Sequence, residues 1–147
     1  TENQIAFQFK TTTLLSRLVE GSFPNYEQVV PVKKDIQVTL DTKAFVGITK
    51  RASLCASDRG GSVRFTLRTG ALHVYASSPN LEFDDELAVD FKGDEFAIAF
   101  NPQFILEGLK AFDSEKVTMS LTAPVNPALF EPAGETDYKY VVMPMRV

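Results

Sequence analysis

The chain has 147 residues, of which 44% are hydrophobic and 23% charged, a composition typical of a soluble globular protein of one domain or slightly more. Its net charge of −4 argues against tight binding of nucleic acid by bulk charge, although a local basic face remains compatible with it. The single cysteine, Cys55, excludes an internal disulfide and favours a reducing compartment, so we expect a cytoplasmic location. No apolar run approaches the roughly 20 residues that span a bilayer, so no membrane contact is expected. The start at Thr1, without an initiator methionine or a signal-peptide pattern, suggests a processed or truncated chain.

The first part of the chain predicts two strands followed by a junction. Residues 5–9 alternate apolar and polar side chains, which is typical of a half-buried strand, and residues 11–19 predict a second strand after a turn near Lys10. Residues 20–31 contain Gly21, two prolines and scattered large apolar side chains without a period, which indicates a linker or domain junction. Because a solvated linker rarely carries so many large apolar groups, we expect it to lie against a surface.

Beyond the junction, one pattern occurs twice: a strand, a helix and then three strands. Asp41 and the pair Asn101-Pro102 are suitable helix starts, and they predict helices over residues 43–56 and 103–112. The apolar faces of these helices comprise Phe45, Ile48, Ala52 and Cys55 in the first, and Ile105, Leu109 and Phe112 in the second. The predicted strands are 36–40, 63–68, 72–76, 86–91, 95–100, 116–121, 128–131 and 138–143. The pattern indicates a duplicated α+β fold with two helices packed on antiparallel sheets.

Each predicted helix contains an interior glycine, Gly47 in the first and Gly108 in the second. A glycine costs about 1 kcal/mol relative to alanine in a helix interior. Two such glycines at similar positions indicate either that the helices approach a neighbouring surface closely or that both glycines are simply tolerated.

The sequence shows no constellation of residues that predicts catalysis. His73 alternates within a predicted strand and has no evident orienting partner, so a surface or packing role is favoured over that of a general base. One cysteine and one histidine do not predict a zinc site, and the run 58–61 is interpreted as a turn. We therefore expect a binding or assembly module without cofactor or metal. The alternative is a small ligand-binding or hydrolase-like α+β domain that uses His73.

The last residues, 140–147 (YVVMPMRV), form an apolar strand that continues to the end of the chain. Chain ends are usually polar unless something holds them, whereas this one carries two methionines around a proline. Methionine adapts its shape and recurs at surfaces that accept several partners. The tail is interpreted either as an ordinary final strand tucked into the core or as an exposed docking surface.

Four segments resemble the bacterial DNA polymerase III beta subunit, the sliding clamp: residues 16–31 (SRLVEGSFPNYEQVVP), 50–54 (KRASL), 100–104 (FNPQF) and 140–147. The resemblance is collinear from about Ile5 to the end. It implies the DNA clamp fold, in which three similar domains per subunit close as a dimer around duplex DNA and give the replicative polymerase its processivity. Residues 1–22 would end the middle domain, residues 23–33 would be the connector, and residues 34–147 would be the third domain of a longer, non-catalytic subunit.

The resemblance also implies a slot in which the replicative polymerase, the clamp loader and repair proteins dock a short peptide with a glutamine and a Leu-Phe pair. Carried over position by position, the wall of this slot is Pro24, Val29, Asn101, Phe104, Val125, Pro127, Val141, Met143, Pro144, Met145 and Arg146. Two positions depart from the family pattern: Gln28 replaces a frequent arginine, and Phe104 replaces an occasional tyrosine. Both departures shorten the polar reach of the wall.

Two further surfaces follow from the resemblance. The contact that closes a homodimeric ring corresponds to Leu54, Cys55, Glu82, Asp84, Asp85 and Glu86. The helices that line the hole would present Lys43, Lys50, Arg51 and Lys110 to DNA phosphates without reading sequence. The open alternatives are a solvated acidic sheet edge for the first surface and ordinary solvated lysines for the second.

Overall fold

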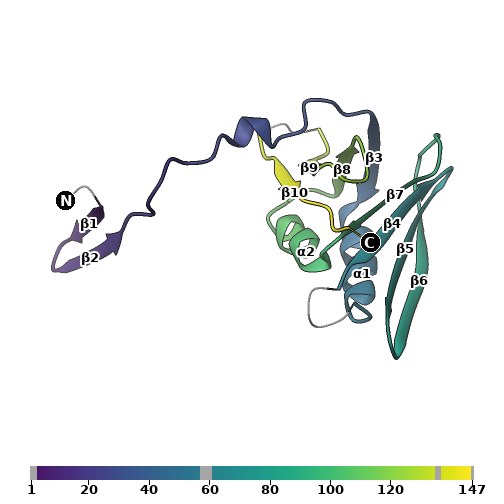
Figure 1. The fold of residues 1–147 in the computed structure, drawn as a ribbon, viewed down its shortest axis with the longest axis horizontal. Helices are drawn as coiled ribbons and strands as arrows, with labels where there is room; N and C mark the ends of the chain where they lie inside the picture. Colours follow the sequence, from purple (N-terminus) through teal and green to yellow (C-terminus); the bar gives the residue numbers. More distant parts are fainter. Residues whose placement is uncertain (1–2, 57–60, 135–136, 147) are drawn as a thin grey trace.

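The computed structural model describes residues 3–56, 61–134 and 137–146, which form a hairpin at one end of an extended connector and a compact body at the other (Figure 1). Most of the turn predicted at 58–61 lies outside the described residues. In the described part the elements are β1 (Gln4–Phe9), β2 (Thr12–Arg17), the 3-10 turn η1 (Tyr26–Gln28), β3 (Ile36–Asp41), α1 (Thr42–Ser53), β4 (Val63–Arg68), β5 (Ala71–Ser78), β6 (Leu81–Ala88), β7 (Phe96–Phe100), α2 (Pro102–Lys110), β8 (Lys116–Leu121), β9 (Ala128–Pro132) and β10 (Tyr140–Val142). None of the described helices is long and apolar enough to cross a bilayer.

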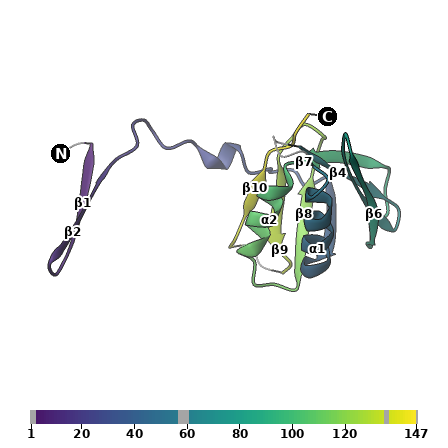
Figure 2. The same cartoon turned by 90° about the horizontal axis from the view of Figure 1, so that it is seen from below.

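The hairpin β1–β2 stands apart from the body in both views (Figures 1 and 2). Its strands pair antiparallel through a turn at Lys10, which has a φ of 50°. The predicted alternation is present, but the prediction of half-burial is wrong: Phe7 and Phe9 are 56% and 72% exposed. Alternation of apolar and polar residues predicts which side chains share a face of a strand. Burial also requires another part of the protein to cover that face, and the described body does not cover this hairpin.

The connector is also more exposed than predicted. Phe23 and Val32 are 84% and 93% exposed, and Asn25 caps the short turn η1 by accepting a hydrogen bond from the Glu27 N–H at 3.1 Å. The expected surface contact is restricted to the far end of the connector, where Val30 and Pro31 are half-buried.

The two predicted units exchange their first strands. The body contains two four-stranded antiparallel sheets with strand orders β10-β9-β8-β3 and β6-β5-β4-β7. Strand β3 therefore pairs with β8 of the second unit, and β7 pairs with β4 of the first. The duplicated α+β architecture is confirmed, and this exchange makes the two halves one folding unit.

Both helices begin where their caps predict. The Ala44 N–H donates to Asp41 Oδ1 at 2.8 Å, and the Gln103 N–H donates to Asn101 Oδ1 at 3.0 Å with Pro102 in the first turn. Both helices end two or three residues before the predicted positions, so Cys55 and Phe112 lie beyond them. Phe112 is still buried, whereas Cys55 is half-buried.

Strand β6 is the largest correction. It was predicted over residues 86–91, but it spans Leu81–Ala88 and pairs with β5 from Ala71↔Ala88 to Ser78↔Leu81. The first half of this strand was not predicted because it is rich in Asp and Glu, which are depleted in strands. Phe91, predicted as a strand residue, is buried outside the strand.

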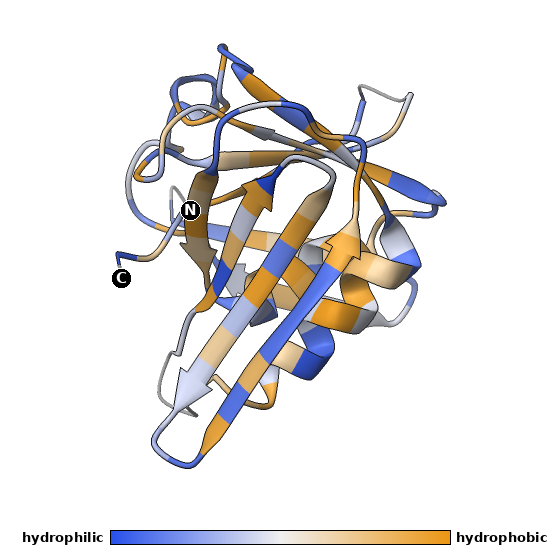
Figure 3. Cartoon of the chain, turned by 90° about the vertical axis from the view of Figure 1, so that its right-hand side faces the viewer, coloured by the Kyte–Doolittle hydropathy of each residue, from blue (hydrophilic) through white to orange (hydrophobic). Residues whose placement is uncertain are grey.

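Four phenylalanines join α1 to both sheets. Phe45 of α1 lies 5.7 Å from Phe65 of β4 and 6.3 Å from Phe130 of β9, measured between ring centroids. Phe100 of β7 completes the cluster at 6.0 Å from Phe65 and 6.2 Å from Phe130. Apolar and polar residues alternate along the strands of the β6-β5-β4-β7 sheet (Figure 3), so this sheet turns an apolar face toward the cluster and a more polar face toward solvent. In the other sheet, β9 is buried on both faces.

Candidate functional site

The last described residues, 143–146, form an open tail. Val142, the end of β10, is buried, whereas Met143 is 58% exposed and Pro144 and Met145 are half-buried. One backbone hydrogen bond holds the tail against the edge strand β7: the Met145 N–H donates to the Ala99 carbonyl at 2.8 Å. The alternative in which the tail is tucked into the core is therefore wrong.

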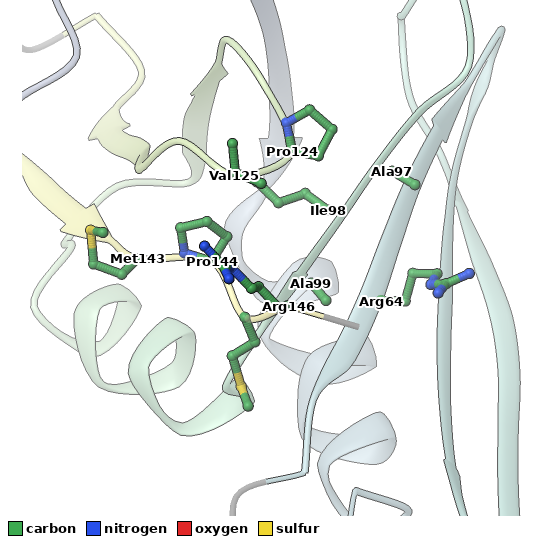
Figure 4. Close-up of a pocket in the computed structure, with 10 residues that line it drawn as sticks. Arg64, Ala97, Ile98, Ala99, Pro124, Val125, Met143, Pro144 and Arg146 are labelled. Carbon is green, nitrogen blue, oxygen red and sulfur yellow. The ribbon is translucent and has the colours of Figure 1, made fainter.

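Beside the tail lies a hollow of about 620 Å³, which we call the tail hollow. It is lined by Arg64, Ala97, Ile98, Ala99, Pro124, Val125, Met143, Pro144, Met145 and Arg146. Figure 4 shows Val125 and Ile98 on one side, Pro144 and Arg146 on the other, and the Arg64 side chain directed away from the tail. The hollow is thus largely apolar, with a cation, Arg146, at its rim.

The predicted wall residues are divided among three hollows. Five of them line the tail hollow. Pro24, Val29 and Val141 line a second hollow of about 530 Å³ between the connector and β10, the connector hollow. Pro127 and Val29 line a third, of about 560 Å³, between the connector and the 122–127 loop. Val29 therefore belongs to two neighbouring hollows.

The remaining two predicted residues line none of these three hollows. Asn101 is the N-cap of α2, and Phe104 is 51% exposed on the first turn of that helix. Phe104 is linked to the strand that leads into the tail, because the Tyr140 hydroxyl donates to its carbonyl at 2.9 Å.

Five residues of the tail hollow were absent from the prediction: Arg64, Ala97, Ile98, Ala99 and Pro124. They come from β4, β7 and the loop after β8. The sequence contained little indication of these residues, because no local pattern predicts which sheet edge the last residues of a chain will follow. Pro124 alone had such a signal, as a neighbour of the predicted Val125.

The acidic residues predicted for the ring interface lie on β6, an edge strand of its sheet. Asp85 is already engaged within the chain: Arg51 Nη2 donates to its Oδ2 at 2.8 Å, and the Arg51 guanidinium lies over the Phe83 ring. The Arg51 hydrogen bond, assisted by the Glu86 N–H, lowers the pKa of Asp85. Glu82 and Glu86 are exposed on the face of β6 that points away from α1. Leu54, the residue directly after α1, is 74% exposed.

The other member of this acidic group, Asp84, is 2.8 Å from His73, measured from Oδ1 to Nε2. His73 faces Thr66 on β4 and Glu86 on β6, on the solvent-facing side of the sheet. It lines none of the three hollows described above. The sequence revealed no orienting partner for His73, and the structure corrects this, because Asp84 is one. The pair lies on the solvent-facing side of the sheet and outside these hollows, which favours the surface role predicted for His73 over the hydrolase-like alternative. Among the described residues, no three His, Cys, Asp or Glu side chains are grouped to hold a metal ion.

The four residues predicted to face DNA are all exposed, and they lie on two helices that run side by side (Figure 2). Lys43, Lys50 and Arg51 belong to α1, and Lys110 ends α2. Arg51 differs from the three lysines, because its charge is paired with Asp85.

The fold and the tail define a duplicated α+β domain whose last described residues, 143–146, lie beside a largely apolar hollow. The family described as "DNA polymerase III beta subunit, C-terminal domain" matches residues 27–146. The chain belongs to this family, as its resemblance predicted.

Relatives and solved structures agree with this assignment. The beta sliding clamp of Pseudomonas putida KT2440 is 35% identical over 136 residues, which cover 92% of this chain and 37% of that protein. The beta sliding clamp of Streptomyces coelicolor is 34% identical over 153 residues, covering 99% and 40%. The crystal structure of a Pseudomonas aeruginosa DNA polymerase sliding clamp with ligand superposes with a TM-score of 0.89 at 30% identity, covering 100% and 40%. The chain thus spans about two fifths of the length of these relatives.

Proposed function

We propose that this chain is the C-terminal part of a ring-shaped sliding clamp that confers processivity on the replicative DNA polymerase. The ring encircles duplex DNA without catalysis, and the tail docks peptides of the polymerase, the clamp loader and repair proteins. Residues 1–22 end the middle domain, residues 23–33 connect, and residues 34–147 form the third domain. The family match supports the class of protein, and the open tail supports the docking role.

The exposed tail carries this proposal. An apolar chain end that is half-covered and lies beside a hollow of about 620 Å³ suits a ligand that inserts apolar side chains. Each anchored side chain contributes roughly 1.5–3 kcal/mol through burial. The methionines fit several partners because their side chains adapt in shape.

The division into hollows suits a peptide with more than one anchor. Val141 of β10 lines the connector hollow, and Met143, directly after β10, lines the tail hollow. Met143 is exposed and lies between these two hollows in the chain. A peptide that crosses Met143 can place one apolar residue in each hollow. The Leu-Phe pair fits the apolar residues of the tail hollow, and Arg146 at its rim suits an acidic neighbour.

The test is a titration of a fluorescent Gln-Leu-x-Leu-Phe peptide with the 147-residue chain. We expect saturable binding that Met143→Ala or Pro144→Ala weakens by about threefold to tenfold, the loss of part of one apolar contact. Leu81→Ala, which removes an equally exposed apolar side chain on β6, serves as the matched control and should leave the affinity unchanged. A tail variant that binds as tightly as the wild type would exclude the tail as the docking surface.

The ring contact is proposed at the β6 edge with Leu54. The exposed acids Glu82 and Glu86 would meet basic residues of a second subunit, and Leu54 would be covered. In sedimentation of the full-length subunit, Leu54→Asp should weaken the homodimer. Val125→Asp, at an exposed apolar residue of the loop between β8 and β9, is the control and should leave the homodimer unchanged. A dimer of unchanged strength in the Leu54 variant would reject this interface.

A further inference from the structure

Strand β10 and helix α2 lie side by side in both views of the fold (Figures 1 and 2), and the contact between them depends on Gly108. A Cβ atom at Gly108 would overlap the ring of Tyr140, with ring atom Cζ at 2.7 Å and two other ring atoms closer still. Gly108 is itself buried. This glycine therefore allows an aromatic ring to lie directly on the helix backbone.

The same tyrosine reaches one turn back along the helix. Its hydroxyl donates to the Phe104 carbonyl at 2.9 Å, four residues before Gly108. A helical carbonyl that accepts the backbone bond of the next turn keeps a second lone pair, so the tyrosine bond adds to the helix ladder without replacing a part of it. One side chain thus spans a full turn of α2.

The hydroxyl is held in its donating form. Burial, and after it the nearby charges of Glu107 and Tyr138, raises the pKa of Tyr140 above its ordinary value of 10.0. The neutral phenol is the form that donates a proton, and it therefore persists throughout the physiological range of pH.

Tyr140 also lies close to the tail. Two residues separate it from Met143, and the Phe104 side chain is 51% exposed on the same turn whose carbonyl Tyr140 binds. We propose that Tyr140 is a positioning residue for the peptide site: it holds α2 at a fixed distance from the tail. With α2 it holds the exposed Phe104 side chain, which lines none of the three hollows but which the resemblance places on the wall of the slot. This inference depends on the proposed peptide docking.

The variant Tyr140→Phe tests it, because it removes the hydroxyl and keeps the ring against Gly108. With the Gln-Leu-x-Leu-Phe probe and the full 147-residue chain, we expect the variant to weaken binding about threefold to tenfold, as for one neutral hydrogen bond. In a Phe104→Ala background the same substitution should have no effect, because the hydroxyl acts through Phe104. A role in stability alone would lower the melting temperature and leave affinity unchanged, or change it equally in both backgrounds.

Tyr138→Phe is the matched control. The Tyr138 ring packs on Phe112 with a centroid distance of 5.1 Å, and none of the hydrogen bonds of the described residues uses its hydroxyl. Tyr138→Phe should leave the affinity for the peptide unchanged, both in the wild-type background and in the Phe104→Ala background. Equal effects of Tyr138→Phe and Tyr140→Phe would overturn the proposal.

Amide exchange provides a readout that does not need the peptide. Tyr140→Phe should speed the exchange of the α2 amides and leave that of β4 and β5 unchanged. Unchanged exchange in α2 would refute the positioning role, whatever the peptide does. If the wild type binds no peptide while α2 responds, the docking proposal fails and the link between Tyr140 and α2 stands.

Discussion

Lys34 and Glu131 form an ion pair across 97 residues of chain, with Lys34 Nζ 2.6 Å from Glu131 Oε2. The Glu131 side chain, on β9, is 7% exposed, whereas that of Lys34, directly after the connector, is 35% exposed. A carboxylate so deeply buried is tolerated because a cation reaches it. The pair therefore fixes the point at which the connector joins the body, beside the hollow that Lys33 and Asp35 line.

Breaking this pair should destabilise the fold. Lys34→Met leaves Glu131 buried without its cation, and we expect a loss of about 1–3 kcal/mol in the free energy of unfolding, below the full value for a buried pair because Lys34 is partly solvated. Urea unfolding at neutral pH measures it. Lys33→Met, which alters the exposed neighbouring lysine, should change stability by less than about 0.5 kcal/mol. Lys34→Met/Glu131→Met should recover most of the loss; a double variant no more stable than the single would contradict this explanation.

The two helix glycines should respond to alanine in opposite directions. A methyl group at Gly47 meets one side-chain atom, Arg51 Nη1 at 3.7 Å, so Gly47→Ala should stabilise by about 0.5–1 kcal/mol through helix propensity. At Gly108 the methyl group collides with the Tyr140 ring, and we expect Gly108→Ala to destabilise by at least about 2 kcal/mol. Thermal melts of both variants give the comparison. Equal shifts of the same sign would show that the contact between Gly108 and Tyr140 is not what distinguishes the glycines.

These glycines also show what a sequence can and cannot predict. The caps Asp41 and Asn101 act on backbone amides two or three residues away, so the helix starts could be predicted from local residues. The difference between Gly47 and Gly108 depends on a tyrosine brought in by a distant strand, and no local pattern contains it. The two interpretations of these glycines therefore had to remain open.

The site follows the same division. The residue types of the tail left two interpretations open, a buried final strand and an exposed docking surface, and only the resemblance to the clamp family favoured the second. The tail's neighbours Ile98 and Ala99 could not be predicted, because they depend on β7 being a free sheet edge, and that follows from the exchange of strands between the two units. The exposure of Phe7 was missed for a related reason, since alternation predicts a face and not the surface that covers it.

The ion pair between Arg51 and Asp85 should contribute to stability in a pH-dependent way. The folded-state pKa of Asp85 is below its ordinary value of 3.8, so the contribution is complete above that value and disappears as the pH falls through the folded-state pKa. Asp85→Asn should therefore be less stable than the wild type at about pH 7, and the difference should shrink as the pH falls below 3.8 and through the folded-state pKa. Urea midpoints across this range measure it. Glu82→Gln, on the same strand, is the control, and its difference from the wild type should not depend on pH in this way. If the difference between Asp85→Asn and the wild type persists at low pH, it reflects packing and not charge.

The basic helix face leads to a prediction for the full-length subunit. Lys43, Lys50 and Lys110 are exposed, whereas the charge of Arg51 is paired with Asp85. The three lysines are therefore the cations that the two described helices can offer to phosphates. Replacing all three by serine should weaken binding to duplex DNA of any sequence. It should also reduce the slope of log affinity against log salt by about one for each lysine that contacts a phosphate. Fluorescence anisotropy over a salt series measures both effects.

Lys92→Ser removes an exposed lysine from the loop between β6 and β7, away from the helices, and should leave the slope unchanged. If the triple variant keeps the wild-type slope, the lysines are ordinary solvated side chains and the DNA must pass another face.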